Sequence, residues 1–408
     1  MIETKEKKER FVLFAVSETD EEETISSLEE LAELTETAGG EVLELFLQSL
    51  DHPHPGTYLG SGKIEELKER VRELEADGVI CDDELSPAQM KNLSDLLQVK
   101  VLDRTLLILD IFAGRAQTRE GKIQVELAQL KYRATRLTGQ GTSLSRLGGG
   151  IGTRGPGESK LEADRRAIHR RIGQLKAELE EVVKHREVQR ERRQKGSLPV
   201  AAIVGYTNAG KSTLLNVLTG AGILAEDKLF ATLDPTTRNL KLPGGEEVLL
   251  TDTVGFINKL PHQLIDAFKS TLEEARYADV LIHVVDATSP RMKLQMDTVY
   301  RTLKELQVED KPVITLFNKC DLGLDQLTYD GNAREALRVS AKTGKGLDRF
   351  QESLSRLMKE QKVYLDRIFA YKDAGLIALI RKQGTDVKEE YLDEGIHVTA
   401  MVPRNLGV

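Results

Sequence analysis

The chain has 408 residues, of which 40% are hydrophobic and 30% charged, which excludes a disordered chain and is typical of globular proteins. At roughly 100–200 residues per domain, this length predicts two to four domains. Two cysteines, Cys81 and Cys320, exclude a disulfide framework, and no apolar run reaches the ~20 residues of a membrane helix. We therefore expect a cytoplasmic protein with no signal peptide and no integral membrane segment.

The net charge of −8 conceals an uneven distribution. Residues 1–50 carry 14 acidic and 4 basic side chains, whereas residues 121–195 carry 18 Lys and Arg against 9 Asp and Glu. A basic block in an acidic chain is typical of a surface that binds polyanions, of which nucleic acid is the commonest. A solvated helical face is the alternative interpretation.

Residues 1–119 alternate strand-like and helix-like patterns. Short β-rich runs such as ERFVLFAVSE and EVLELFLQSL are separated by helical stretches, one of which begins at Ser86 and Pro87. Such alternation predicts an N-terminal α/β domain with a mostly parallel sheet covered by helices. The stretch GTYLGSGK at 56–63 lacks the spacing of a phosphate loop, so we interpret it as a turn that opens a helix.

Residues 120–195 form the basic block. A helical pattern, GKIQVELAQLKYRATRL, is followed by eight glycines within residues 139–157 and by a second helical pattern from Ser159 to about Lys195. Ser159 and Glu162 have the spacing of a capping box, which marks a helix start. A narrow apolar seam with charged flanks predicts an antiparallel helical hairpin; it consists of Leu161, Ile168, Ile172, Leu175, Leu179, Val182 and Val183.

Residues 196–362 contain a phosphate-binding loop. The sequence LPVAAIVGYTNAGKSTLLNVL reads as an apolar strand, a loop and a helix, and the loop fits G-x-x-x-x-G-K-[ST]. Glycines let the backbone amides surround the β-phosphate, Lys211 reaches the β- and γ-phosphates, and the Ser212 hydroxyl can ligate magnesium. The expected phosphate-binding residues are Gly205, Tyr206, Thr207, Asn208, Ala209, Gly210, Lys211 and Ser212.

Three further motifs follow in the order that a GTPase needs. They are D-x-x-G at Asp252, Thr253, Val254 and Gly255, N-K-x-D at Asn318, Lys319, Cys320 and Asp321, and S-A-K at Ser340, Ala341 and Lys342. Asp252 can hold magnesium through water, and the Gly255 amide can bond the γ-phosphate. The Asp321 carboxylate can accept from guanine N1–H and the 2-amino group, neither of which adenine offers. Together the motifs predict guanine-nucleotide binding in a GTPase domain with a mostly parallel sheet.

Residues 363–408 read as a strand, a helix and two strands, which predicts a small α+β C-terminal domain. No constellation of residues in this segment suggests catalysis. The expected fold class is therefore α/β multidomain, with an N-terminal α/β domain at 1–119, a basic hairpin at 120–195, a GTP-binding domain at 196–362 and this C-terminal domain at 363–408.

The motifs GYTNAGKS, FATLDPTTR, DTVGF, NKCD and SAK, with GTRGPGESKLEADRR upstream, resemble the HflX family in the translation-factor branch of P-loop GTPases. The resemblance covers nearly the whole chain and is weakest over the last ~45 residues. It implies Mg²⁺ as cofactor, slow intrinsic GTP hydrolysis, and binding to the large (50S) ribosomal subunit in ribosome dissociation, rescue or biogenesis. We expect the protein to be a monomer, and we do not expect DNA as a partner.

The same resemblance implies further nucleotide-binding residues in FATLD, that is Phe230, Ala231, Thr232, Leu233 and Asp234. FATL is similar to the FTTL of the related Obg GTPases, whose second threonine is the magnesium ligand, so we choose Thr232 over Thr236 and Thr237. Ser212 and Thr232 are thus the expected metal ligands.

Two side chains bear on the rate of hydrolysis. Phe256 follows the D-x-x-G glycine, where Ras-like proteins place a water-orienting glutamine, and a phenyl ring cannot orient water. We expect Phe256 to be retracted into the core, and intrinsic hydrolysis to be slow and accelerated by a docking partner. Asn208 resembles the asparagine of GTPases that recruit K⁺, so our hypothesis is that K⁺ stimulates turnover.

Three functional readings follow. The first is a ribosome-bound GTPase whose basic hairpin contacts ribosomal RNA through Arg146, Arg154, Arg165 and Arg166. The second is a signalling switch that binds a protein effector and no RNA. The third gives the N-terminal half an ATP-linked activity, although residues 1–195 contain no second G-x-x-x-x-G-K-[ST]. The glycines near Arg154 can also serve only as a slack connector.

Overall fold

The computed structural model describes residues 8–137, 156–194, 198–220, 229–230, 233–259, 274–308, 310–323, 329–360 and 362–403. The chain forms two compact units. One comprises Met1–Glu181 with the short segments Glu226–Asp234 and Phe256–Thr271. The other comprises Val182–Ala225, Pro235–Gly255 and Leu272–Val408. Two stretches from the middle of the sequence therefore pack with the N-terminal part of the chain.

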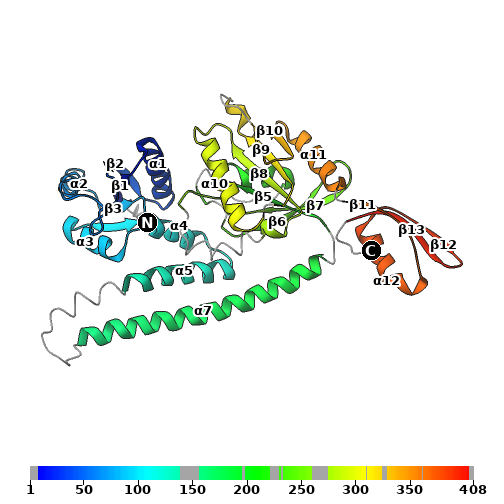
Figure 1. The fold of residues 1–408 in the computed structure, drawn as a ribbon, viewed down its shortest axis with the longest axis horizontal. Helices are drawn as coiled ribbons and strands as arrows, with labels where there is room; N and C mark the ends of the chain where they lie inside the picture. Colours follow the sequence, from blue (N-terminus) through cyan, green and yellow to red (C-terminus); the bar gives the residue numbers. More distant parts are fainter. Residues whose placement is uncertain are drawn as a thin grey trace, which may run out of the picture. The chain divides into compact units, whose positions relative to one another are not determined.

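The N-terminal sheet is parallel throughout, as the alternating pattern predicts (Figure 1). Its order is β2-β1-β3-β4, built from β1 (Arg10–Ser17), β2 (Glu41–Ser49), β3 (Gly78–Cys81) and β4 (Lys100–Asp103). Both β1 and β3 are buried along almost their whole length, as expected for strands that helices cover on two faces.

Helices cover both faces of this sheet. Helices α2 (Ser61–Glu73) and α3 (Pro87–Leu97) share one core with Val12, Phe14 and Val16 of β1. Helices α1 (Glu21–Thr37) and α4 (Arg104–Arg115) contact each other, and α1 packs on β1 and β2. Ser86 caps α3 in a reciprocal capping box with Gln89, and α2 begins directly after the turn at 56–60. Both helix starts are as expected.

The basic block contains two helices that lie side by side, α5 (Arg119–Leu137) and α7 (Pro156–Gln194) (Figure 1). Arg171 of α7 donates through Nε to Glu126 Oε1 of α5 at 2.8 Å. Within the seam Leu175 is fully buried, and Ile168 and Leu179 are half-buried. These contacts confirm the hairpin.

The expected start of the second hairpin helix at Ser159 is wrong. Helix α7 already begins at Pro156, so Ser159 lies inside the helix. Proline suits the first helical position because its missing N–H would have no partner there.

The second unit is built on a six-stranded sheet of order β10-β9-β8-β5-β7-β6. Its strands are β5 (Val200–Gly205), β6 (Thr236–Lys241), β7 (Glu247–Asp252), β8 (Val280–Asp286), β9 (Val313–Asn318) and β10 (Glu335–Arg338). All pairs are parallel except β6 with β7. The strand order reverses at β5, and ligands of open α/β sheets bind at the carboxyl ends of strands at such a reversal.

Helices cover this sheet on both faces too. Helices α8 (Lys211–Thr219) and α11 (Leu347–Glu360) pack into one core through Leu215 and Phe350. Helix α10 (Met292–Glu305) packs through Met292 and Met296 on Val285 of β8, whose neighbour Val284 faces the first core. Short 3₁₀ turns lie at Cys320–Leu322 and Tyr371–Asp373.

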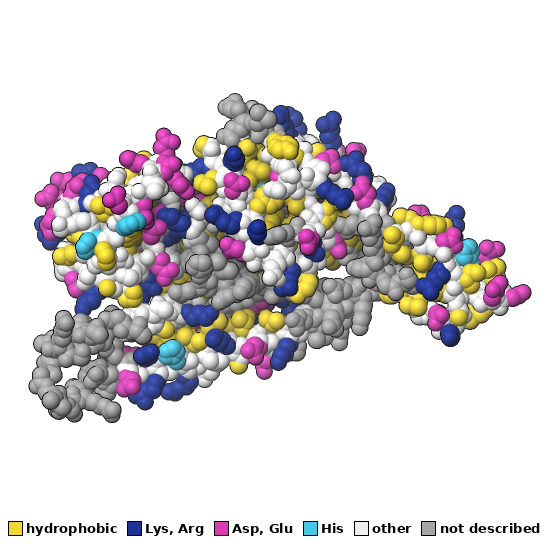
Figure 2. Space-filling model, in the orientation of Figure 1, with side chains coloured by type: hydrophobic (Ala, Val, Ile, Leu, Met, Phe, Trp, Pro, Cys, Tyr) yellow, Lys and Arg dark blue, Asp and Glu magenta, His cyan; other side chains and the backbone are white. Residues whose placement is uncertain are grey.

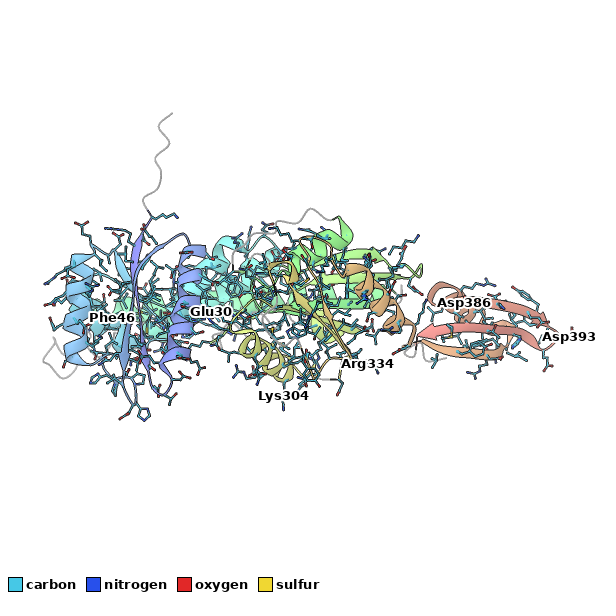
Figure 3. All side chains as sticks on the ribbon, turned by 90° about the horizontal axis from the view of Figure 1, so that it is seen from above. Glu30, Phe46, Lys304, Arg334, Asp386 and Asp393 are labelled. Atoms are coloured by element: carbon cyan, nitrogen blue, oxygen red, sulfur yellow. The ribbon has the colours of Figure 1, made fainter. Side chains whose placement is uncertain are left out.

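The C-terminal part is a three-stranded antiparallel sheet with one helix, which confirms the α+β prediction. The sheet has the order β11-β13-β12, from β11 (Lys362–Phe369), β12 (Thr385–Leu392) and β13 (Gly395–Pro403). Helix α12 (Ala374–Gln383) packs Ile377 and Ile380 against Val398 and Ala400. Figure 3 labels Asp386 in β12 and Asp393 in the turn that leads to β13. Among the described residues, no helix is long and apolar enough to cross a membrane.

Candidate nucleotide-binding site

The phosphate loop lies between β5 and α8, at the carboxyl end of a strand that is buried except at Val200. Gly210 caps α8 with φ 95°, and a Cβ added there would lie 2.3 Å from Asn318 Nδ2. Asn208 also has a positive φ, 59°. Only glycine satisfies both demands at 210, and the loop thereby presents the amides of the α8 N-terminus, which favour anions.

Lys211 is the first residue of α8, and its side chain is buried. Its Nζ donates to the Tyr206 carbonyl at 2.7 Å. Burial lowers the pKa of Lys211 to about 8, and Asp252 opposes this shift. A buried ammonium beside a loop of amides offers the charge that a phosphate needs.

Ser212 and Asp252, the two motif residues expected to bear on magnesium, contact each other. The Ser212 hydroxyl donates to Asp252 Oδ2 at 2.7 Å, and Asp252 is fully buried at the end of β7. The Thr207 hydroxyl is buried and has no hydrogen-bond partner in the described protein. Hydroxyl and carboxylate oxygens are ligands that Mg²⁺ prefers, so this donor set fits the metal.

Gly255 ends the D-x-x-G motif close to the phosphate loop. A Cβ at this position would lie 2.7 Å from Thr207 Cγ2 and 2.9 Å from Lys211 Nζ. Thr253 anchors the motif by donating to the Ile203 carbonyl at 2.7 Å, and Val254 is buried. The motif thus lies directly against the loop, as binding to one triphosphate requires.

The base-recognition motifs are tied to the phosphate loop through Asn318. Its Nδ2 donates to the Ala209 carbonyl at 2.8 Å, and its Oδ1 accepts from the Ala341 amide at 2.8 Å. One buried side chain therefore joins three loops that the sequence separates widely.

The remaining base-site residues lie around this asparagine. Asp321 is exposed, and a hydrogen bond from Ser340 is the main cause that lowers its pKa, so the carboxylate is ionised and oriented. Lys319 pairs with Asp286 at 2.8 Å, while Cys320 is half-buried and Lys342 exposed. Asp286 was not singled out from the sequence, although its place at the end of the buried run VLIHVVD was a usable signal.

The segment expected to carry the metal-ligating threonine is described only in part. Ala231 and Thr232 lie outside the described residues. Phe230 is buried with its ring edge on Phe112, at a centroid distance of 4.6 Å, and Leu233 is buried as well. Phe256 is 3% exposed, in agreement with a retracted phenyl ring.

The structure describes two of the four arginines expected to contact RNA. Arg165 and Arg166 are exposed on α7, whereas Arg146 and Arg154 lie outside the described residues. Figure 2 shows Lys and Arg side chains along α7, with fewer Asp and Glu among them.

Comparisons with known proteins agree with this geometry. Three family models match: "GTP-binding GTPase N-terminal" over 25–113, "GTP-binding GTPase Middle Region" over 115–193 and "50S ribosome-binding GTPase" over 200–319. A protein of Lacrimispora saccharolytica called "GTPase HflX" is 63% identical over 100% of this chain and 96% of its own length. The Escherichia coli protein of that name is 46% identical over 83% and 81%.

A solved structure, the "crystal structure of SsGBP and GDP complex", is similar over 86% of this chain and 98% of its own, with a TM-score of 0.50 and 28% identity.

Proposed function

We propose that the GTP state of this chain, which belongs to the GTPase HflX family, controls its binding to the large ribosomal subunit. As a member it hydrolyses GTP to GDP and phosphate. The ribosomal role is supported by one observation above others: the motifs of a guanine-nucleotide site, joined through Asn318 and Asp252, and a basic hairpin with exposed Arg165 and Arg166 lie in one chain. The description of the third family model, "50S ribosome-binding GTPase", favours the same partner.

The nucleotide would be bound by the residues of the motifs at the ends of β5, β7 and β9, together with Thr232. The loop amides and Lys211 would hold the phosphates, and Asp321 with the Ala341 amide would bind guanine. Ser212, Thr232 and, through water, Asp252 would hold Mg²⁺, which supplies charge neutralisation on the phosphates when bound. The Thr207 hydroxyl, which is buried with no hydrogen-bond partner in the described protein, can donate to a phosphate oxygen.

Slow intrinsic turnover follows from Phe256. Its buried phenyl ring cannot orient a water molecule, so the described part of the D-x-x-G segment offers no such group. We propose that the ribosome supplies the missing stimulation, and that the outcome is ribosome dissociation, rescue or biogenesis by a monomer in the cytoplasm.

Potassium belongs to the same proposal. Asn208 lies in the phosphate loop with a positive φ of 59°. Asparagine adopts this left-handed conformation more readily than most residues do. Turnover measured in KCl should exceed turnover in NaCl of equal ionic strength. Equal rates in the two salts would remove K⁺ from the mechanism.

Co-sedimentation with purified large subunits tests the ribosomal role. The wild-type chain should pellet with subunits in a non-hydrolysable GTP analogue, and less in GDP. The double variant Arg165→Glu, Arg166→Glu should weaken pelleting and reduce its salt dependence, while GTP affinity is retained.

A matched control reverses two exposed charges that do not belong to the hairpin, Lys293→Glu and Lys304→Glu on α10 (Lys304 is labelled in Figure 3). This control should pellet like wild type. Failure of the wild type to pellet in any nucleotide state would favour the signalling switch with a protein effector.

A further inference from the structure

Two short segments that adjoin the nucleotide-site motifs in sequence belong to the N-terminal unit. One ends at Asp234, immediately before β6, and the other begins at Phe256, immediately after the D-x-x-G glycine. In P-loop GTPases such segments respond to the γ-phosphate. The contacts that hold them are therefore contacts through which a nucleotide can act on the rest of the chain.

The first segment is held by the carboxylate of Asp234. Asp234 Oδ2 accepts from the backbone amides of Gln117 at 3.0 Å and Thr118 at 2.9 Å, and Oδ1 accepts from the Thr118 hydroxyl. The same hydroxyl accepts from the Gly121 amide at 3.0 Å. Thr118 thus caps α5, and Asp234 binds to this cap from a distant part of the sequence. A carboxylate is favoured there by the free amides and by the helix dipole.

Gly121 leaves room for this contact. A Cβ at 121 would lie 2.7 Å from Asp234 Oδ1, a separation that real Cβ atoms do not show. Glycine disfavours helix interiors, so helix propensity alone does not explain its place in the first turn of α5. The position is explained by the approach of the carboxylate.

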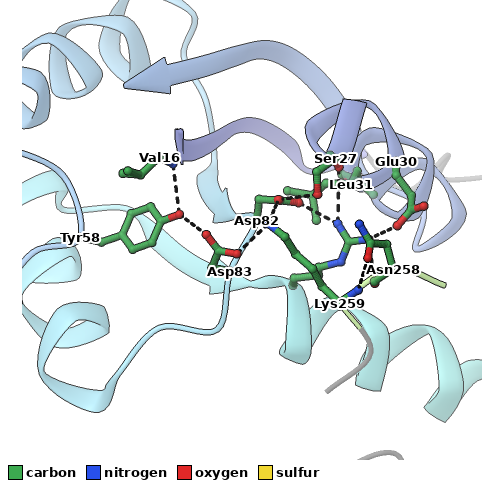
Figure 4. Close-up of polar contacts among 11 residues, drawn as sticks. Val16, Ser27, Glu30, Leu31, Tyr58, Asp82, Asp83, Asn258 and Lys259 are labelled. Atoms are coloured by element: carbon green, nitrogen blue, oxygen red, sulfur yellow. Dashed lines mark hydrogen bonds and ion pairs between the residues drawn. The ribbon is translucent and has the colours of Figure 1, made fainter. Parts of the chain in front are cut away.

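The second segment is held by charged groups at the carboxyl end of β3. Lys259 Nζ lies 2.5 Å from Asp82 Oδ2 and 2.7 Å from Asp83 Oδ1, and Arg104 donates to the Asn258 carbonyl at 3.3 Å (Figure 4). Asp82 is fully buried and also accepts from Ser27. Although burial opposes ionisation, Arg104 and Lys259 lower the pKa of Asp82, so Asp82 and Lys259 form a charged pair.

Backbone geometry shows that both segments are constrained. Phe230 has φ 55° and Lys259 has φ 49°. Bulky residues keep such conformations only where their surroundings hold them.

Helix α5 is also fixed at its other end. Tyr132 donates to Asp103 at 2.8 Å, and Arg136 pairs with the same carboxylate at 2.8 Å. Both ends of α5 are therefore bonded to other parts of the N-terminal unit.

We propose that Asp234 is a positioning residue that couples the bound nucleotide to α5, the first helix of the basic hairpin. Thr232, the expected magnesium ligand, is two residues away, and two residues span at most about 7 Å. Binding of Thr232 to the metal would therefore change the fit of Asp234 on the Thr118 cap. This route deepens the proposed function and rests on it for Thr232 as magnesium ligand and for the hairpin's partner.

Hydrogen exchange at the α5 N-terminus tests the coupling without a ribosome. In the wild-type chain, peptides containing the Gln117 and Thr118 amides should exchange at rates that differ about fivefold or more between GDP and a non-hydrolysable GTP analogue. In Asp234→Ala the two rates should become equal. Equal rates in the wild type, or a difference that survives in Asp234→Ala, would overturn the proposal.

Gly121→Ala separates coupling from helix stability. Alanine favours the helix but displaces Asp234, so the nucleotide-dependent difference should disappear while GTP affinity stays within about twofold. Gly173→Ala in α7 is the matched control, because a Cβ there meets nothing within 4 Å. It should retain the difference. A normal difference in Gly121→Ala would contradict the role given to Asp234.

Pelleting with large subunits keeps the two proposals apart. If pelleting of the wild type depends on the nucleotide and pelleting of Asp234→Ala does not, both the ribosomal function and the coupling are supported. Absence of pelleting in every chain removes the ribosomal function and leaves the exchange result to decide the coupling. Equal nucleotide dependence of pelleting in wild type and Asp234→Ala overturns the coupling and leaves the ribosomal function standing.

Discussion

Asn318 holds the Ala209 carbonyl of the phosphate loop through its Nδ2, at 2.8 Å. Its other side-chain atom, Oδ1, accepts from the Ala341 amide, also at 2.8 Å. The side chain is buried, and the loops expected to contact phosphate and guanine therefore share one support. This relationship makes the affinity for the whole nucleotide sensitive to a residue that need not touch it.

Replacing Asn318 by alanine should lower GDP affinity at least about tenfold, since each buried partner left unpaired costs about 1–3 kcal/mol. Titration with a fluorescent GDP analogue measures the effect. Asn239→Ala, at an exposed position of β6, is the control and should bind GDP normally. A normal affinity in Asn318→Ala would show that the two loops are held by other contacts.

The two glycines that flank α8 should differ sharply in their tolerance of alanine. Gly210→Ala should abolish nucleotide binding, because its Cβ would lie 2.3 Å from Asn318 Nδ2. Gly220 also has a positive φ, 65°, but a Cβ there meets nothing within 4 Å. Gly220→Ala should cost about 1–2 kcal/mol of stability and leave GDP binding intact. Calorimetric titration of both variants makes the comparison, and equal binding losses would contradict it.

The choice of magnesium-ligating threonine can now be tested against a structural alternative. Thr237 lies in β6, and its hydroxyl shares a hydrogen bond of 2.9 Å with Thr251 on β7. We expect Thr232→Ala to lower the affinity for a GTP analogue at least about tenfold and to leave GDP affinity unchanged. Thr237→Ala should leave the ratio of the two affinities at the wild-type value. The reverse pattern would move the ligand to Thr237.

Acid should destabilise the unit that contains His283. Burial lowers the pKa of this histidine, which lies in β8 with its ring edge on Tyr300. Below the ordinary histidine pKa of 6.5, the unfolded chain therefore binds more protons than the folded chain. In that range the free energy of unfolding decreases as the pH falls, by at most about 1.4 kcal/mol per pH unit.

Urea unfolding at pH 7.5, 6.5 and 5.5 measures this loss. His283→Gln should show a shallower fall than the wild type over the same range. His52→Gln, at an exposed histidine, should follow the wild type. If His283→Gln and wild type fall in parallel, other groups carry the acid sensitivity.

The nucleotide site could be predicted because its chemistry is local. A loop that surrounds phosphate needs Gly210, Lys211 and Ser212 at adjacent positions, and guanine recognition needs Asn318 and Asp321 at the end of a strand. The parallel sheets follow from strand and helix patterns that repeat within a few residues. The hairpin follows from one apolar seam, although proline moved the start of α7 to residue 156.

The connections of the flanking segments depend on tertiary structure. Asp234 and Gln117 are 117 positions apart, and Lys259 and Asp82 are 177 apart, so no local periodicity relates them. By sequence Gly121 is only a weak point in a helix. The fold explains the glycine, because Asp234 lies so close to Gly121 that a Cβ would collide with its carboxylate. Such collisions occur between atoms that folding brings together, whatever their separation along the chain.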